Sequence, residues 1–162
     1  MDRKELLLSL WVETYSDSLL RMCYLYLGNR TQAEDAVQDT WVKVWRALCR
    51  ENKTIENEKA WLCRIAVNTC RDYQKSAWHR HVDERKALEE LPETFFSTET
   101  GDFSLTQMVL ALPDREREMI LLYHYQGLTL KECARVLHIS QTAAHRRLKG
   151  AEEHLKWEWE EN

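Results

Sequence analysis

The stretch that decides the fold of this chain reads Leu62-Cys63-Arg64-Ile65-Ala66-Val67-Asn68-Thr69-Cys70-Arg71-Asp72-Tyr73. Wound as an α-helix at about 100° per residue, it divides into two sides. One side is an expected core stripe formed by Leu62, Ala66, Thr69, Cys70, Tyr73 and Ala77. The other side gathers polar, cationic and aromatic residues within a sector of roughly 80°, namely Arg64, Asn68, Arg71, Lys75 and Trp78. Such a face is typical of proteins that hold an unpaired nucleic-acid strand.

Taken alone, a basic helix face is more often simply exposed to solvent. The rest of the chain therefore has to show whether this face binds nucleic acid. The chain has 162 residues with only four Gly and two Pro, which predicts an all-α protein. No run of 18 or more apolar residues occurs, so we expect no membrane insertion and a cytoplasmic protein. The five cysteines form no Cys-x-x-Cys pair, which favours buried reduced thiols over a metal site. We expect no cofactor and no enzymatic activity, because no nucleophile motif or glycine-rich phosphate loop is present.

The net charge of −4 hides a change of sign along the chain. Residues 1–82 carry 13 basic and 11 acidic side chains, and residues 83–105 carry 2 and 7. Residues 106–151 carry 7 and 4, and residues 152–162 carry 1 and 5. Two mildly basic blocks around an acidic one predict two polyanion-binding modules, 1–82 and 106–162, joined by an acidic linker, 83–105. Such weak basicity predicts poor DNA binding by the chain alone.

Helix start and stop signals divide the chain further. The expected helices cover residues 3–27, 32–49, 58–81, 114–126, 130–137 and 141–157. We expect Thr31 and Thr129 to begin helices as capping boxes, and Asn57 and Ser140 to act as N-caps. The apolar side expected for the first helix consists of Leu6, Leu7, Leu10, Trp11, Tyr15, Leu19, Met22 and Cys23. In the linker, Phe95 and Phe96 either dock on a partner or staple the linker to the second module.

The last two helices form a short helix, a tight turn and a longer helix, which predicts a helix-turn-helix. The side of the longer helix that carries Ala144, Leu148, Ala151 and Leu155 is expected to pack on the shorter one. The opposite side presents polar residues where a recognition helix enters the major groove, namely Thr142, His145, Arg146 and Lys149, with Arg147 on the flank.

The chain resembles the extracytoplasmic-function sigma factors, the two-domain promoter-recognition subunits of bacterial RNA polymerase. Residues 33–48 resemble region 2.2, reading Ala33-Glu34-Asp35-Ala36-Val37-Gln38-Asp39-Thr40-Trp41-Val42-Lys43-Val44-Trp45-Arg46-Ala47-Leu48. The segment from Trp61 to Asn68, with Asp72-Tyr73, resembles regions 2.3 and 2.4, and residues 112–155 resemble region 4. The resemblance covers nearly the whole chain in order.

The resemblance implies partners and roles. Binding to the β′ clamp helices of core polymerase is implied for the exposed side of the second helix, namely Asp35, Gln38 and Asp39, with Val42 and Arg46 beside them. Contact with the separated −10 strand is implied for Trp61, Arg64, Asn68, Arg71, Lys75, Trp78 and Arg80. Docking at the −35 element is implied for Thr142, His145, Arg146, Arg147 and Lys149. A polymerase β-flap contact and an anti-sigma partner are also implied, and no metal is expected.

The recognition helix departs from the family pattern. The family usually begins this helix Gly-Thr-Val-Lys-Ser-Arg-Leu, whereas residues 142–148 read Thr-Ala-Ala-His-Arg-Arg-Leu. Gly150 and Glu152 stand where arginines are usual. Two alternatives remain open from the residues themselves: a dimeric helix-turn-helix repressor that reads duplex DNA, and a helical adaptor that binds only proteins.

Overall fold

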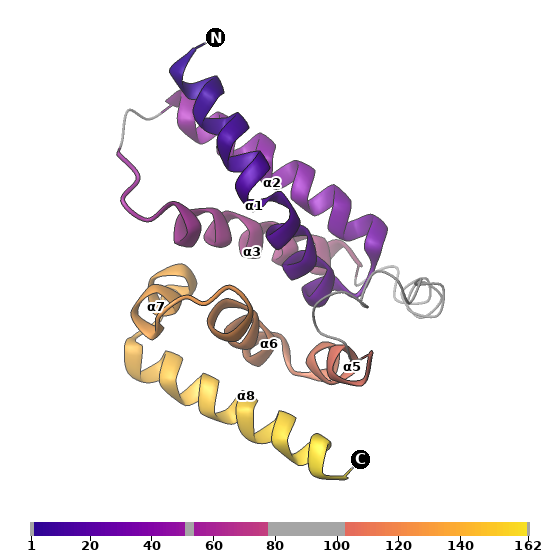
Figure 1. Cartoon of the computed structure of the whole chain (residues 1–162). Coiled ribbons are helices and arrows are strands. Elements are labelled where there is room, and N and C mark those ends of the chain that lie inside the picture. Colours follow the sequence, from indigo (N-terminus) through magenta and orange to yellow (C-terminus); the bar gives the residue numbers. More distant parts are fainter. Residues whose placement is uncertain (1, 51–53, 78–102, 162) are drawn as a thin grey trace.

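The computed structural model describes residues 2–50, 54–77 and 103–161. Within these ranges the secondary structure is helical and contains no strand, which confirms the all-α prediction. Figure 1 shows two groups of helices in contact, an N-terminal bundle of α1–α3 and a C-terminal bundle of α5–α8. The linker prediction, with Phe95 and Phe96, falls mostly outside the described residues.

The N-terminal bundle consists of α1 (Arg3–Leu27), α2 (Arg30–Arg50) and α3 (Glu58–Ala77). The three helices pack on one another around side chains that are almost completely inaccessible to solvent. These include Trp11, Leu19, Met22, Val44, Leu62, Ala66 and Cys70. The expected core stripe of α3 is therefore confirmed where its side chains are described, with Tyr73 only half-buried.

Two details of this bundle differ from the predictions. The first turn of α2 is capped by Asn29 and not by Thr31, because the Gln32 backbone N–H donates to Asn29 Oδ1 at 3.0 Å. Leu6 and Leu10 are 55% and 58% exposed and Leu7 is only partly buried, so the fully buried part of the expected apolar side of α1 begins at Trp11. The N-terminal end of α1 extends beyond the part of the bundle that would cover it (Figure 1).

The C-terminal bundle consists of α5 (Phe103–Ala111), α6 (Asp114–Ile120), the π-helical turn η3 (Leu121–Tyr125), α7 (Leu130–Leu137) and α8 (Gln141–Glu161). Helix α5 was not predicted and begins inside the expected linker. The helix expected over 114–126 is present, but its second half widens to π geometry, with the Gln126 N–H donating to the Leu121 carbonyl at 2.9 Å.

The helix-turn-helix is confirmed by its caps. Thr129 accepts from the Glu132 N–H at 3.1 Å while the Glu132 carboxylate accepts from the Thr129 N–H at 2.9 Å. His138 ends α7 in the left-handed conformation (φ 56°), and Ser140 Oγ caps α8 by accepting from the Ala143 N–H at 3.1 Å. On α8, Ala144, Leu148 and Ala151 are buried as predicted.

Polar contacts join the two bundles. Ser18 Oγ of α1 donates to the Gln126 side-chain carbonyl at 2.9 Å, and Gln126 is only 2% exposed. Arg117 of α6 donates through Nη1 to the backbone carbonyl of Tyr26 at 2.6 Å. The two modules predicted from the sequence are thus packed on each other in this structure.

A buried and an exposed leucine provide a matched test of the core. We expect Leu62→Ala, at a side chain with 0% exposure, to lower the free energy of unfolding by about 2–5 kcal/mol. Leu6→Ala removes the same atoms from an exposed site, so its effect is expected to stay within about 0.5 kcal/mol. Urea unfolding followed by circular dichroism measures both, and equal losses would contradict this packing.

Thiol reactivity provides a second test. The prediction of buried reduced thiols is confirmed for Cys23, Cys63, Cys70 and Cys133, but it is wrong for Cys49, which is exposed. Burial raises the pKa of Cys63 and of Cys133 to about 12, so hardly any reactive thiolate forms there at pH 8. We expect one fast-reacting thiol per native chain with Ellman's reagent at pH 8, five in denaturant, and no fast phase in Cys49→Ser. A second fast thiol in the native protein would contradict the burial.

Candidate nucleic-acid interface

The exposed side of α3 presents the amide and two of the cations that the sequence indicated. Arg64, Asn68 and Lys75 are exposed, and among the described residues neither Arg64 nor Asn68 has a hydrogen-bond or ion-pair partner. Trp61, one helical turn before Arg64 and two turns before Asn68, is held against Trp11, with 5.9 Å between the ring centroids and a 57° tilt. Both polar side chains therefore stand free beside an aromatic ring that is already fixed in place.

These side chains line an open groove of about 900 Å³. Its walls come from the C-terminal half of α2, the segment before α3, the exposed side of α3, and α7 of the C-terminal bundle. Trp61, Arg64 and Asn68 line it together with Lys43 and Arg135. Three cations, an amide and an indole around one groove can hold a phosphate backbone and a splayed base.

Two of these cations could not be predicted from the sequence. Lys43 lies on α2, where its ammonium group donates to Thr69 Oγ1 at 3.0 Å and pairs with Asp72 at 3.4 Å. Arg135 belongs to α7 and reaches the groove only because the C-terminal bundle packs on α3. The helical periodicity of α3 cannot predict which residues of other helices will lie beside it.

Arg71 differs from the expected free cation. Its guanidinium forms a two-point ion pair with Glu118 of α6, with Nε–Oε2 at 2.7 Å and Nη2–Oε1 at 3.1 Å. The Arg71 side chain is 37% exposed and that of Glu118 is 3% exposed. The pKa of Arg71 is raised above its usual value, first by this hydrogen bond. Trp78 and Arg80, the other expected strand contacts, lie outside the described side chains.

Helix α3 also buries residues that its amphipathic pattern did not assign to the core. Cys63 and Val67 are 1% and 2% exposed. Both residues lie between the core stripe and the exposed residues of α3, and Cys63 lies near Cys133 and Glu132 of α7. The exposed sector of α3 is therefore narrower than predicted, and it is centred on Arg64 and Asn68.

The recognition helix α8 lies on the outer side of the C-terminal bundle, away from α3 (Figure 1). Its N-terminal part presents Thr142, His145, Arg146 and Lys149 as exposed side chains, while Arg147 is half-buried. The residues proposed for the −35 element therefore share one accessible surface, apart from the flanking Arg147.

The departures from the family pattern in α8 have a structural reason. A Cβ atom at Gly150 would lie 3.1 Å from the Glu116 carboxylate, so α8 approaches α6 closely at that point. Glu152 pairs with His124 of η3 at 3.0 Å, and His154 pairs with Glu116 at 2.7 Å. At these positions α8 contacts its own bundle, and a side chain at position 150 would require the Glu116 carboxylate to shift.

The side of α2 opposite the core forms a second accessible surface. Asp35, Gln38, Asp39, Val42 and Arg46 are all exposed, and Val42 is a large apolar residue with 47% exposure. Tyr73 of α3 donates to Asp39 Oδ2 at 2.6 Å. The pKa of Tyr73 is raised, first by burial and then by this carboxylate. An acidic surface with one apolar residue at its centre suits docking of a basic or mixed helix.

Two other features were searched for in the described part of the chain: a metal site and a membrane-spanning helix. No group of three or more metal-ligating side chains occurs among those residues. No described helix is long and apolar enough to cross a membrane.

Comparison with protein families agrees with this arrangement. Residues 11–80 match the Sigma-70 region 2 model, and residues 102–155 match the Sigma-70 region 4 model. The two matches cover the N-terminal bundle from Trp11 onward and nearly all of the C-terminal bundle.

Curated relatives include several extracytoplasmic-function (ECF) sigma factors. The chain is 29% identical over 161 residues to the ECF RNA polymerase sigma factor SigW of Bacillus subtilis, covering 90% of this chain and 84% of SigW. It is 28% identical over 131 residues to BldN of Streptomyces coelicolor, covering 77% of this chain but only 50% of BldN. The chain thus spans about half the length of one of these relatives.

Solved structures show the same fold. CnrH, in complex with the cytosolic domain of CnrY, superposes with a TM-score of 0.70 at 22% identity and covers 96% of this chain and 88% of CnrH. The sigma factor RpoE of Bartonella quintana, in complex with the anti-sigma factor NepR, also gives 0.70, at 20% identity, with 94% and 96% covered. From the two family matches and these relatives, the chain belongs to the sigma-70 family and, within it, to the ECF sigma factors.

Proposed function

We propose that this protein directs promoter-specific transcription initiation as a subunit of bacterial RNA polymerase, and so acts in the cytoplasm. The observation that carries the proposal is the groove beside α3, where Arg64 and Asn68 are exposed next to the fixed indole of Trp61. In this role α3 captures the separated −10 strand, α2 binds the β′ clamp helices, and α8 docks on the −35 duplex.

Strand capture requires no catalytic group. Stacking a base on an aromatic ring is worth about 1–3 kcal/mol, and one DNA stacking step costs about 1.4 kcal/mol to break. A few captured bases can therefore balance the opening of a few base pairs. Asn68 supplies donor and acceptor groups for a base edge. Arg64 and Lys75 supply charge for phosphates.

In the proposed function, polymerase binds a surface that is separate from the groove beside α3. The exposed side of α2 carries Asp35 and Asp39 around Val42, and it does not include the groove residues Arg64 and Asn68. A clamp helix can therefore bind α2 while a strand occupies α3. The same separation argues against an adaptor that binds only proteins, since such a protein has no use for the groove.

A dimeric repressor that reads only duplex DNA would use α8 and leave α3 idle. Gel filtration with and without core polymerase distinguishes the two functions, because the sigma factor forms a complex with the core. The solved relatives CnrH and RpoE were captured with protein partners, and we propose a comparable anti-sigma partner for this chain.

The strand-capture role predicts a selective defect. We expect Asn68→Ala to lower run-off transcription from the cognate promoter about tenfold, the effect of losing about 1.4 kcal/mol of base contact. Core binding in a pull-down is expected to stay unchanged, because Asn68 is not on the exposed side of α2. A parallel loss of both activities would refute the assigned role.

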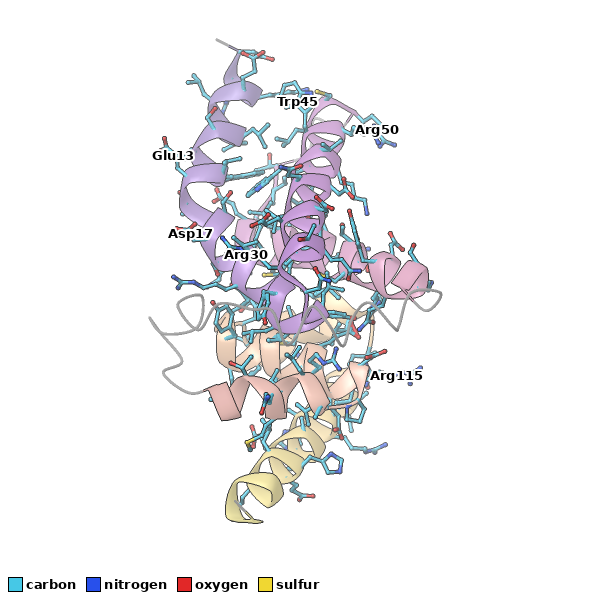
Figure 2. All side chains as sticks on the ribbon, turned by 90° about the vertical axis from the view of Figure 1, so that its right-hand side faces the viewer. Glu13, Asp17, Arg30, Trp45, Arg50 and Arg115 are labelled. Atoms are coloured by element: carbon cyan, nitrogen blue, oxygen red, sulfur yellow. The ribbon has the colours of Figure 1, made fainter. Side chains whose placement is uncertain are left out.

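The proposed role of α2 in binding the clamp helices predicts a defect in core-polymerase binding. Asp39→Arg reverses a charge on α2 and removes the acceptor of Tyr73, so we expect core polymerase to bind about tenfold more weakly. Asp17→Arg makes the same charge change on the outer side of α1 (Figure 2), where we expect no effect on core binding. Titration of labelled core polymerase measures both, and equal affinities for the two variants would count against the clamp surface.

A further inference from the structure

We propose that a pocket in the C-terminal bundle, apart from the groove beside α3, binds a small molecule that carries an apolar tail and a protonated amine. The pocket has a volume of about 370 Å³. Its lining comes from α5, α6, η3 and the C-terminal half of α8, together with Leu25 of α1. None of the lining residues belongs to the predicted strand, clamp or −35 sets. The inference therefore goes beyond the proposed function and does not depend on it.

The walls of the pocket favour an apolar tail. Aliphatic side chains make up most of the lining, namely Leu25, Leu105, Val109, Ile120, Leu121 and Leu155. Val109, Ile120 and Leu121 are 7%, 6% and 1% exposed, so these wall residues are held in place by the packing of the bundle. Pockets that bind small molecules are mostly apolar, with volumes of about 300–1,000 Å³. This pocket has the composition of such a site and lies near the lower end of the range in volume.

The charged groups of the pocket determine the sign of the ligand. His124, Tyr125 and Glu152 are the titratable residues of the lining, which contains no lysine or arginine. Glu152 Oε1 pairs with His124 Nε2 at 3.0 Å, and the Glu152 side chain remains 47% exposed. A protonated amine can therefore approach the other carboxylate oxygen while the contact with His124 stays in place. An anionic head group would meet the same carboxylate without a lysine or arginine to pair with.

The sequence around Glu152 strengthens this preference. Residues 152–162 carry 1 basic and 5 acidic side chains. A local excess of one sign of charge attracts ions of the opposite sign and repels ions of the same sign. The charge of this segment and the carboxylate in the pocket lining therefore both favour a cation.

The π-helical turn η3 gives a separate reason to expect a ligand. Turns of this kind are rare and frequently lie at functional sites. Here the turn contributes Leu121, His124 and Tyr125 to the lining. The His124 ring packs edge-on against Tyr123, with 5.0 Å between the ring centroids, and pairs with Glu152. The polar side of the pocket is thus ordered before a ligand binds, which lowers the entropic cost of binding.

The size of the pocket distinguishes a small molecule from a partner helix. One turn of an α-helix, about 10 Å across and 5.4 Å long, occupies about 420 Å³. That volume exceeds the whole pocket, which is about 370 Å³. The proposal therefore commits to a small molecule that enters the pocket completely.

The first test uses the free, full-length chain and three probes that share one alkyl tail: octylamine, octanol and octanoate. Methyl NMR of the isoleucine, leucine and valine side chains measures both the location of binding and the affinity. We expect octylamine to shift the methyl signals of Val109 and Ile120 but not those of Val44, which is buried in the N-terminal bundle. Octanoate is expected to bind about tenfold more weakly than octylamine, with octanol between them. Equal affinities for octylamine and octanoate, or unshifted Val109 and Ile120 signals, would overturn the proposal.

The second test removes the carboxylate. Glu152→Gln keeps the size of the side chain but loses its charge, and Glu153→Gln makes the same change at the next, exposed residue, which does not line the pocket. We expect octylamine to bind about fivefold more weakly to Glu152→Gln and with wild-type affinity to Glu153→Gln. The same affinity for both variants would contradict the assigned contact.

The third test fills the pocket. Leu105 lines it from α5, whereas Gln107 is exposed on the same helix and does not. We expect Leu105→Trp to bind octylamine about tenfold more weakly, because exposing about two methylene groups of the tail accounts for that loss. Gln107→Trp is expected to match the wild type. A Leu105→Trp variant with native circular dichroism and undiminished affinity would refute the site, and the two glutamate variants decide the matter if Leu105→Trp does not fold.

Discussion

The structure depends on the burial of α3 from two directions. One side of the helix, including Leu62 and Cys70, packs into the N-terminal bundle. A second side, including Cys63 and Val67, is also buried, and Cys63 lies near Cys133 of α7. A helix with two buried sides has only one narrow sector left for solvent. That constraint concentrates the unpaired functional groups at Arg64 and Asn68, and it turns Arg71 at the edge of the sector toward α6.

The same constraint links binding surfaces to one another. Helix α2 contributes Lys43 to the groove and Asp39 to the proposed polymerase-binding surface, and both side chains also bond to α3. The polar bonds between α2 and α3 therefore hold two separate surfaces in a fixed relation. A protein that has to bind polymerase and DNA together gains from such rigidity, because neither partner has to order the bundle on binding.

The recognition helix shows how packing inside a bundle limits DNA contacts. Near its N-terminus α8 is free on one side, but Gly150, Glu152 and His154 bring it against α6 and η3. Cations usual in the family are therefore missing where this chain uses the helix for its own stability. The predicted −35 surface is confined to the first two turns of α8.

Local sequence determined every described helix except α5, most of the helix caps and the two-sided character of α3, because periodicity and capping depend on residues a few positions apart. It also placed the exposed residues of α2 and α8 correctly. Tertiary structure alone decided that Arg71 pairs with Glu118 and that Arg135 lines the groove. These contacts join residues from different bundles, and no periodicity within one helix records which other helix will pack on it.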